Sequence, residues 1–412
     1  MKKTLAAVAV LGAFAGSALA ADVQLYGIVD TGVGYNHVDV DSLDGINIPN
    51  KAGDATAYSF ADSDSFSMMS GQASGSRWGL KGTEDLGNGL TVGFILEDGF
   101  TSDNGADSAP MFNRESSLFV QGGFGKFAMG RMGSLNNGQS SWAKVGMVSA
   151  FGTSDWGGYS AQLSNIFSLA GQWDNMVAYE TPSFAGFKVY AQYAMGSNNN
   201  ENESSSDRYY AIGATYNNGP FAGYFAVDSI NYQTSGAKID DKYIDDSLTV
   251  TLGGSWNFEV AKVYFGAQYF DEVKLSSIGG ITKTTVSDVN LSKIGDLPDI
   301  TVGALVKVKG YGISLTADAP VAGGKAMFGV GYVDAEAADS IQDALKDANA
   351  DADLDLKRYV VSVGYDYPFS KRTDVYAIAS YMQDQVDTKL SGTSYDWDPS
   401  AYTLYVGLRH RF

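Results

Sequence analysis

The feature of this sequence that most constrains its fold is an alternation of apolar and polar residues with a period of two. In residues 90–97 every second residue is apolar, and Glu97 belongs to the other set. In residues 187–193 the odd positions are apolar, whereas Lys188 and Gln192 oppose them. The same alternation recurs at 260–269, 302–309 and 402–409. Because successive side chains of a strand point to opposite faces, these runs predict strands with one apolar and one polar face.

Strands of this kind occur in two settings, and the sequence favours one of them. A soluble sandwich packs the apolar faces of two sheets together, whereas a transmembrane barrel turns its apolar face to lipid and its polar face to an aqueous lumen. Here Tyr and Phe gather near the ends of the apolar runs, as aromatic girdles at membrane interfaces require. The polar faces carry Lys, Glu and Gln in mid-strand, which suits contact with water. We therefore predict a transmembrane β-barrel.

The connectors between the runs set the number of strands. Most of the short connectors are rich in Gly, Asn and Pro, which adopt turn dihedrals at low cost; the seven lie at 83–88, 122–125, 183–186, 217–220, 257–259, 322–324 and 368–373. Eight long connectors lie at about 37–66, 101–111, 134–174, 197–207, 233–246, 271–299, 337–355 and 386–399. Together they join sixteen strands, so the predicted fold class is all-β, a sixteen-stranded antiparallel transmembrane barrel. Closure leaves no sheet edge unpaired in hydrocarbon.

The first twenty residues predict export. Lys2 and Lys3 precede an apolar run over 5–14, and a small-x-small cleavage site lies at 18–20. This order is that of a secretory signal peptide, and the segment is too short and wrongly flanked for a membrane anchor. No later stretch reaches the ~18 consecutive apolar residues that a spanning helix needs. We therefore predict a cleaved signal peptide at 1–20 and a single barrel domain at 21–412.

Composition narrows the function. The formal net charge is −19, and an acidic chain lacks the cationic surface that neutralises nucleic-acid phosphates. There is no Cys, and the two His are His37 and His410, which leaves little room for thiol or His chemistry. Residues 347–355 resemble the start of an EF-hand, but Ala352 and Arg358 replace its Gly and Glu. We predict no enzyme, no cofactor, no metal site and no nucleic-acid partner, and leave open diffuse binding of divalent cations by acidic loops.

Short stretches spread along the whole chain resemble one family. Among them are LYGIVD at 25–30, SRWGLKGTEDLG at 76–87 and YETPSFAGF at 179–187, with further matches at 112–114, 122–125, 130–131, 364–367, 370–376 and 406–412. In their order and spacing they resemble the trimeric general porins of Gram-negative outer membranes, in particular those of β-proteobacteria. The resemblance implies a homotrimer in the cell outer membrane, with three water-filled pores, short periplasmic turns and long external loops. It also implies contact with outer-membrane lipid, lipopolysaccharide and the outer-membrane assembly machinery.

The resemblance implies passive diffusion of ions and small hydrophilic solutes. The alternative is a substrate-selective channel on the same fold, for organic acids or other anions, which a basic pore wall favours. In the family, an aromatic end to the closing strand resembles the signal that the assembly machinery reads. Phe412 lies on the apolar face of the last run, with Leu408 and Val406, and is the candidate for that signal.

The resemblance also places the pore constriction. Porins of this kind fold the third long loop, here about 134–174, into the barrel. Asp155 is the only carboxylate of that loop before Asp174. Opposed charges across a narrow gap create a field that orders dipolar solutes and sorts ions.

The basic side of the constriction is carried over from the family's strand motifs to Arg77 and Arg114. Lys81 has the same strand parity as Arg77. Arg131 matches a Gly-Arg pair of the family, but its direction stays open. Since acidic residues gather in the other long loops, the choice between anion and cation selectivity also stays open here.

Overall fold

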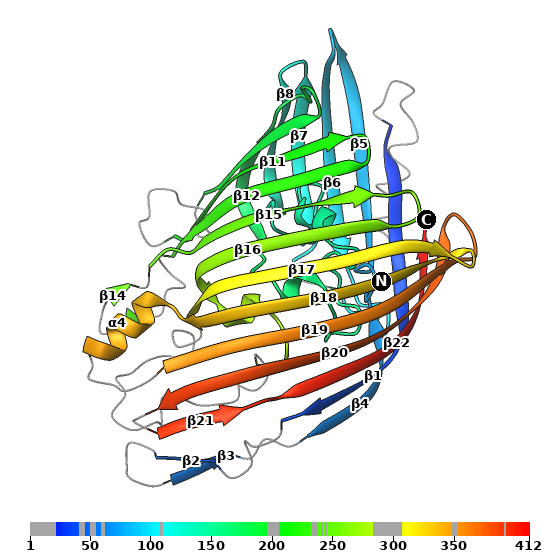
Figure 1. Ribbon diagram of the computed structural model, residues 1–412. Helices are drawn as coiled ribbons and strands as arrows, with labels where there is room; N and C mark the ends of the chain where they lie inside the picture. Colours follow the sequence, from blue (N-terminus) through cyan, green and yellow to red (C-terminus); the bar gives the residue numbers. More distant parts are fainter. Residues whose placement is uncertain are drawn as a thin grey trace.

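The chain folds into one barrel of tilted strands (Figure 1). The computed structural model describes residues 22–40, 46–49, 55–58, 62–107, 110–195, 206–232, 238–239, 242–243, 245–282, 307–347, 353–390 and 393–412. The barrel wall consists of β1 (Gln24–Asp39), β4 (Ser63–Ser70), β5 (Arg77–Gly87), β6 (Leu90–Gly99), β7 (Glu115–Gly122), β8 (Gly125–Gly133), β9 (Gln172–Glu180), β10 (Phe187–Ala194), β11 (Arg208–Asn218), β12 (Phe221–Asn231), β15 (Leu248–Asn257), β16 (Lys262–Lys274), β17 (Lys307–Val321), β18 (Gly324–Ala337), β19 (Asp353–Pro368), β20 (Thr373–Leu390), β21 (Thr393–Trp397) and β22 (Ser400–Arg411).

These elements make sixteen wall strands, because two of the strands are interrupted. β4 and β5 both pair with β1, at its far and near ends respectively. Likewise β21 and β22 both pair with β20. β1 also pairs with β22, from Ile28 opposite Arg411 to Asp39 opposite Ser400, and this pairing closes the sheet on itself. The predicted sixteen-stranded antiparallel barrel is confirmed.

Short turns and long connections lie at opposite ends of the barrel, as predicted. At one end β7 runs into β8 and β17 into β18 through tight turns, and β1 begins and β22 ends on this side (Figure 1). The other end carries two small hairpins and one helix: β2 (Ile46–Pro49) with β3 (Ala55–Tyr58), β13 (Lys238–Ile239) with β14 (Lys242–Tyr243), and α4 (Asp339–Asp347). Within the described residues, no helix combines the length and the apolar character needed to cross a membrane. The signal peptide predicted at 1–20 lies outside the described residues.

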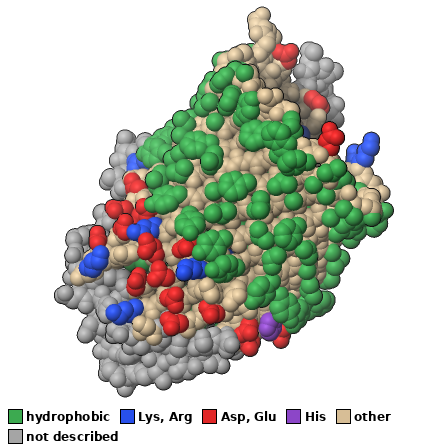
Figure 2. All heavy atoms as spheres, viewed as in Figure 1, with side chains coloured by type: hydrophobic (Ala, Val, Ile, Leu, Met, Phe, Trp, Pro, Cys, Tyr) green, Lys and Arg blue, Asp and Glu red, His purple; other side chains and the backbone are tan. Residues whose placement is uncertain are grey.

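The outward face of the wall is apolar and is bounded by two rings of aromatic side chains. Leu118, Ile212, Leu252 and Leu404 are exposed there, and Figure 2 shows apolar side chains spread over the barrel. Toward the long-loop end the ring contains Tyr193, Tyr210, Tyr311, Tyr332 and Tyr359. Toward the short-turn end it contains Phe184, Phe187, Tyr216, Phe221, Trp256 and Phe258. An apolar band between two aromatic girdles is the surface that a bilayer requires.

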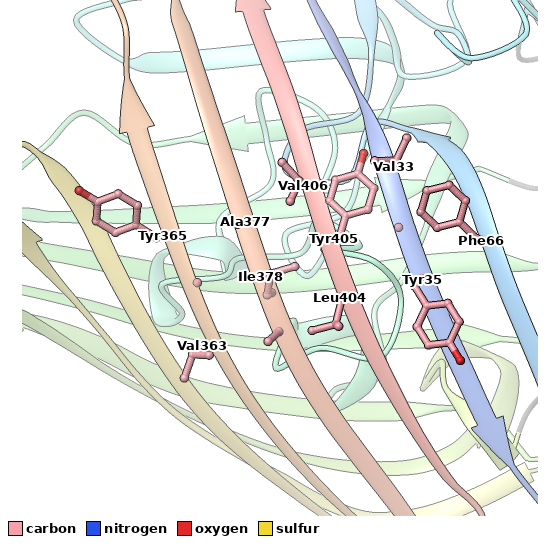
Figure 3. A pocket seen from close by; sticks show the side chains of 13 residues that line it. Val33, Tyr35, Phe66, Val363, Tyr365, Ala377, Ile378, Leu404, Tyr405 and Val406 are labelled. Carbon is pink, nitrogen blue, oxygen red and sulfur yellow. The ribbon is translucent and has the colours of Figure 1, made fainter.

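One part of the outward face is hollowed, where small residues stand among large ones (Figure 3). The depression has a volume of about 590 Å³. Ala377 of β20 lies in it, and larger apolar side chains of β19, β22, β1 and β4 surround it: Val363, Leu404, Val406, Val33, Tyr35 and Phe66. The depression therefore crosses the seam at which the barrel closes.

The lumen is filled in part by residues 134–171, the connection from β8 to β9, which we call the inner loop. It contains two short 3₁₀ turns, η1 (Val145–Val148) and η2 (Leu163–Asn165). Its apolar side chains pack where inward-facing strand positions are Gly. A Cβ atom at Gly266 would lie 2.9 Å from Val148, and one at Gly331 would lie 2.3 Å from Ile166. Glycine at these wall positions therefore makes room for the inner loop.

Candidate pore constriction

Polar side chains of the wall hold the backbone of the inner loop at several points. The amide oxygens of Gln192 and Gln268 accept hydrogen bonds from the backbone N–H groups of Leu135 and Ser168, at 2.9 and 2.6 Å. The hydroxyls of Thr316 and Ser362 accept from Ala150 and Ala161, at 2.8 Å each. These wall residues come from β10, β16, β17 and β19. Because irregular backbone needs hydrogen-bond partners at membrane depth, polar inward positions allow this loop to stay inside the barrel.

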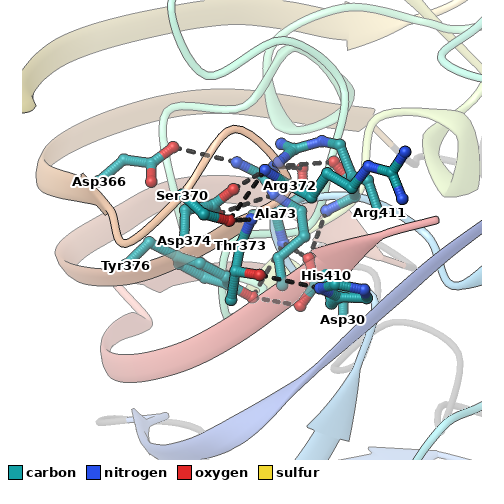
Figure 4. A network of polar contacts seen from close by, with 12 residues as sticks. Asp30, Ala73, Asp366, Ser370, Arg372, Thr373, Asp374, Tyr376, His410 and Arg411 are labelled. Atoms are coloured by element: carbon teal, nitrogen blue, oxygen red, sulfur yellow. Dashed lines mark hydrogen bonds and ion pairs between the residues drawn. The ribbon is translucent and has the colours of Figure 1, made fainter.

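A second irregular segment enters the lumen where β4 and β5 are interrupted. This segment, residues 71–76, is called the strand break below. Asp30 of β1 accepts hydrogen bonds from the N–H groups of Ala73 and Ser74, at 3.1 and 2.8 Å, and from the Tyr376 hydroxyl at 2.5 Å (Figure 4). The backbone carbonyl of Gln72 accepts from the N–H of Trp156 in the inner loop, at 2.8 Å. The strand break thus links the wall to the inner loop.

Arg77 and Arg114 converge on one carboxylate of the wall. The Nε atoms of Arg77 and Arg114 lie 3.5 and 2.7 Å from the Glu97 carboxylate. The Tyr26 hydroxyl donates to the same carboxylate at 3.0 Å. All four residues lie on the side of the wall that faces the lumen: three come from β1, β5 and β6, and Arg114 directly precedes β7. The alternation assigns Glu97 to a polar face, but no local pattern indicates that two arginines meet there.

This cluster touches the inner loop directly. Nη1 of Arg114 donates to the Gln139 side-chain oxygen at 2.9 Å. The neighbouring Glu115 accepts from the backbone N–H and the hydroxyl of Ser141, at 2.8 and 3.0 Å. Wall charges and loop therefore meet at the β6–β7 side of the lumen. Glu115 has no family motif of its own and was missed by sequence reasoning; its place next to Arg114 was the available signal.

The other candidate residues lie around this cluster or away from it. Lys81 is exposed on the same face as Arg77, with its Nζ 5.1 Å from the Tyr26 ring centre. Arg131 is not part of the cluster: it is in register with Ser116, on the outward side, and its Nη1 lies 2.6 Å from Asp174. Asp155 is exposed and borders a hollow of about 440 Å³ elsewhere in the inner loop. Arg77 and Arg114 therefore face a wall carboxylate instead of Asp155.

Further basic residues continue the wall toward β10. The Nζ of Lys126 lies 4.3 Å from the Phe119 ring centre, and that of Lys188 lies 2.7 Å from the Glu180 carboxylate. Lys144 of the inner loop donates to the backbone carbonyl of Ser141 at 2.8 Å. Burial lowers the pKa of Lys144 to about 8. On the lumen side of β5 to β10 and in the inner loop, six basic side chains lie among five carboxylates; the basic ones are Arg77, Lys81, Arg114, Lys126, Lys144 and Lys188, and the acidic ones are Asp85, Glu97, Glu115, Asp155 and Glu180.

A closed barrel with an apolar outer band and a charged, loop-lined lumen defines an outer-membrane channel. The Gram-negative porin family model matches residues 6–387. An outer membrane porin of Bordetella pertussis is 32% identical over 100% of both chains. The chain therefore belongs to the Gram-negative porin family. It is an outer-membrane porin, a water-filled channel for passive diffusion of ions and small hydrophilic solutes.

Two solved structures share the fold. An anion-selective porin from Comamonas acidovorans has a TM-score of 0.61 and 24% identity, over 95% of this chain and 100% of that chain. A trimer form of OmpT from Vibrio cholerae has a TM-score of 0.54 and 16% identity, over 95% of this chain and 100% of that chain. These likenesses extend over nearly the whole barrel and agree with the assignment to the porin family. The characterised members of this family are channels, not enzymes.

Proposed function

We propose that the narrowest part of the pore lies between the inner loop and the Arg77–Glu97–Arg114 cluster. The observation that carries this proposal is the contact of Arg114 with both Glu97 of the wall and Gln139 of the loop. Solutes pass such a site by diffusion past fixed charges, and no bond needs to be made or broken. We also propose that the protein has no enzymatic activity. His37 is bound to Asp64, and His410 to Thr373 at the short-turn end, so neither lies at this site.

A second proposal concerns ion selectivity, where a specific observation favours the anion-selective alternative. At the proposed constriction two guanidinium groups, those of Arg77 and Arg114, meet the single carboxylate of Glu97, although the whole chain is acidic. Charges that line a narrow, water-filled passage act on permeating ions more strongly than charges beyond a Debye length, about 8 Å at physiological ionic strength. We therefore propose a preference for small anions. The porin from Comamonas acidovorans with the same fold is described as anion-selective.

A single experiment addresses both proposals. The reversal potential of the purified protein is measured in a planar bilayer across a salt gradient, for wild type, Arg114→Glu and Arg131→Glu. We expect an anion preference in wild type and a shift toward cations in Arg114→Glu. Arg131→Glu makes the same charge change on the outward side and is expected to leave the reversal potential in place. Equal shifts in both variants would remove Arg114 from the constriction, and no conductance at all would overturn the pore itself.

We propose a homotrimer as the functional unit, in contact with outer-membrane lipid and lipopolysaccharide along the apolar band. The trimer form of OmpT, which shares the fold, supports this proposal. The apolar depression across the closing seam (Figure 3) is a surface on which a neighbouring subunit or a lipid chain can pack. Chemical crosslinking of the detergent-solubilised protein is expected to give a trimer. A monomer at all crosslinker concentrations would contradict it.

We further propose that residues 1–20 are removed on export and that Phe412 is read by the outer-membrane assembly machinery. The N–H of Phe412 donates to Gly27 at 3.1 Å, and the N–H of Gly27 donates back to Phe412 at 3.2 Å. A Cβ atom at Gly27 would lie 2.3 Å from the Phe412 ring, which therefore lies over β1. Phe412→Ser is expected to slow assembly in cells, while refolding of the purified chain in detergent changes little. N-terminal sequencing of the mature protein tests the cleavage site.

A further inference from the structure

A second long connection also enters the lumen. Residues 275–282 follow β16 and begin with the 3₁₀ turn η3 (Leu275–Ser277). Leu275, Ile278 and Ile281 are buried, so this segment packs against the protein instead of extending into solvent. The N–H of Gly279 donates to the Ser164 carbonyl of the inner loop at 2.8 Å. We call residues 275–282 the second inner segment.

One buried ion pair of the wall holds this segment and the inner loop together. Arg358 of β19 and Asp384 of β20 are in register, and neither side chain is exposed. Their bidentate contact has distances of 2.7 Å from Nε to Oδ1 and 2.8 Å from Nη2 to Oδ2. The remaining Arg358 nitrogen, Nη1, donates to the carbonyls of Asn165 at 3.1 Å and Ile278 at 3.3 Å, and also to Gly279. Asp384 accepts from the N–H of Thr282 at 3.1 Å and from its hydroxyl.

The Arg358–Asp384 pair does more than join β19 to β20, because its remaining hydrogen bonds go to loop groups. The strands β19 and β20 are already paired along their length, from Asp353 to Pro368 of β19. Burying an isolated Arg–Asp pair gives little net stabilisation, because desolvation offsets the Coulomb attraction. Such a pair becomes favourable when its remaining donors and acceptors are satisfied. Here loop groups satisfy them: Arg358 holds carbonyls of both loops, and Asp384 holds the second inner segment.

The two loops together border the hollow of about 440 Å³ in the lumen. Ser276 and Gly280 come from the second inner segment, Asp155 and Tyr159 come from the inner loop, and Asn36 of β1 lines the hollow as well. We infer that the second inner segment is a further constricting element of the pore and that Arg358 and Asp384 position it. This inference rests on the proposal that the inner loop forms the constriction. Without the ion pair, the second inner segment leaves the lumen and the passage widens.

The test removes both charges of the Arg358–Asp384 pair together, so that neither is left buried without its partner. Arg358→Met with Asp384→Leu replaces the ion pair by apolar groups of similar size, which avoids one uncompensated buried charge. We expect a higher single-channel conductance than wild type. In liposome-swelling assays we also expect a loss of discrimination between a monosaccharide and a trisaccharide. The folded barrel is checked by its heat-dependent mobility in SDS gels.

A reversible crosslink makes the test specific. The hydroxyls of Ser168 in the inner loop and Ser277 in the second inner segment lie 3.1 Å apart, so Cys residues at these two positions bring their thiols close together. The chain has no Cys of its own. Ser168→Cys and Ser277→Cys are added to the Arg358→Met/Asp384→Leu variant. Oxidation is expected to restore wild-type conductance, and reduction with dithiothreitol is expected to raise it again.

The outcomes separate the inference from the proposal beneath it. Equal conductance in the oxidised and reduced forms, both equal to wild type, would overturn the role of the second inner segment. An unchanged reversal potential in Arg114→Glu would instead overturn the proposed constriction at the inner loop. Arg358→Lys is a matched variant that keeps the charge and loses the fork of donors. It is expected to show a conductance between wild type and the double variant.

Discussion

Strand β20 carries two buried aspartates on its inward face, and each meets an arginine in a different way. Asp374, near the short-turn end, lies 3.0 Å from Arg409 of β22, which also lies 3.0 Å from Asp366 of β19 (Figure 4). Asp384, near the long-loop end, pairs with Arg358 of β19. The chemistry of the two networks is the same. Their remaining hydrogen bonds, however, go to different parts of the molecule.

The Arg409 network joins neighbouring wall strands to one another and to the strand break. Arg409 donates to the carbonyl of Ala73 at 3.4 Å and to the Ser74 hydroxyl at 2.9 Å, both in the strand break beside β1. Arg411 adds a contact of 2.5 Å to Asp374. The network therefore spans β19, β20, β22 and the strand break across the closing seam.

The Arg358 network instead connects the wall to the inner loop and the second inner segment. Two ion pairs on one strand thus serve closure in one place and pore shape in the other.

Arg409→Ala is the variant with the largest expected effect. It leaves Asp366 and Asp374 buried close together with less compensation, and breaking a buried pair in this way costs about 3–5 kcal/mol. We expect a lower free energy of unfolding, measured by urea titration of the heat-dependent gel shift. If stability stays at the wild-type value, the network does not hold the seam. Arg411→Ala, which is more exposed, is the milder control.

Arg358→Met/Asp384→Leu sharpens the contrast by removing charge without removing volume. Replacing a buried ion pair with apolar residues is often neutral, or stabilising by about 1–4 kcal/mol. We therefore expect the unfolding free energy to change far less than in Arg409→Ala, while the conductance changes more. A loss of stability as large as that of Arg409→Ala would make the two networks equivalent. Both variants are measured in the same urea titration and in planar bilayers.

Lys144 is a basic residue of the inner loop that belongs to neither the Arg409 network nor the Arg358 network. Arginine stays protonated at any accessible pH, whereas the pKa of Lys144 is lowered by burial to about 8. Below that pH Lys144 is positive, and above it the group is neutral. Raising the pH from about 7 to about 9 is therefore expected to weaken the anion preference. Lys144→Arg should keep its reversal potential over the same range; an unchanged pH response in that variant would assign the titration to another group.

Asp155→Asn is expected to have the smallest effect. Asp155 is exposed at the hollow of the inner loop, and the arginines of the cluster pair with Glu97 instead. We expect a small shift of the reversal potential toward anions, well below that of Glu97→Gln. The comparison is made at one salt gradient for both variants. A larger shift of the reversal potential for Asp155→Asn than for Glu97→Gln would contradict this prediction and indicate that Asp155 lies at the constriction.

Much of the wall follows directly from the sequence. Alternation predicts that Lys188 and Gln192 share one face, and both lie inward in the structure. The pattern fails where the chain leaves the membrane. Lys307 and Lys309 share a face, as the alternation indicates, but Lys307 is buried beside Glu272 whereas Lys309 is partly exposed. Val308, on the opposite face, is buried as well. Beyond the apolar band a group of a long connection contacts the wall, as the Asp245 carbonyl does by accepting from Lys307 at 2.9 Å, so polarity no longer distinguishes the two faces.

The constriction could be predicted only in part. The resemblance to the family's strand motifs led to Arg77 and Arg114, and strand parity led to Lys81. Their partner Glu97, however, depends on how β5, β6 and β7 are placed side by side. The direction of Arg131 depends on a register shift after Gly130, which has no strong local signal. Asp384 and Thr282 are separated by 102 residues of chain. Contacts of this range come from the closed sheet, and no local pattern encodes them.

The seam between β1 and β22 has a consequence for how the protein is made. It pairs Ile28 with Arg411, so the first and last wall strands can pair only after the chain between them has been exported. Contacts of such long sequence separation form slowly, and until then β1 presents an unpaired edge that can capture another chain. During assembly the protein is therefore prone to pairing with another chain until β22 pairs with β1. A chaperone that shields the edge of β1 during this interval would raise yield without changing the stability of the finished barrel.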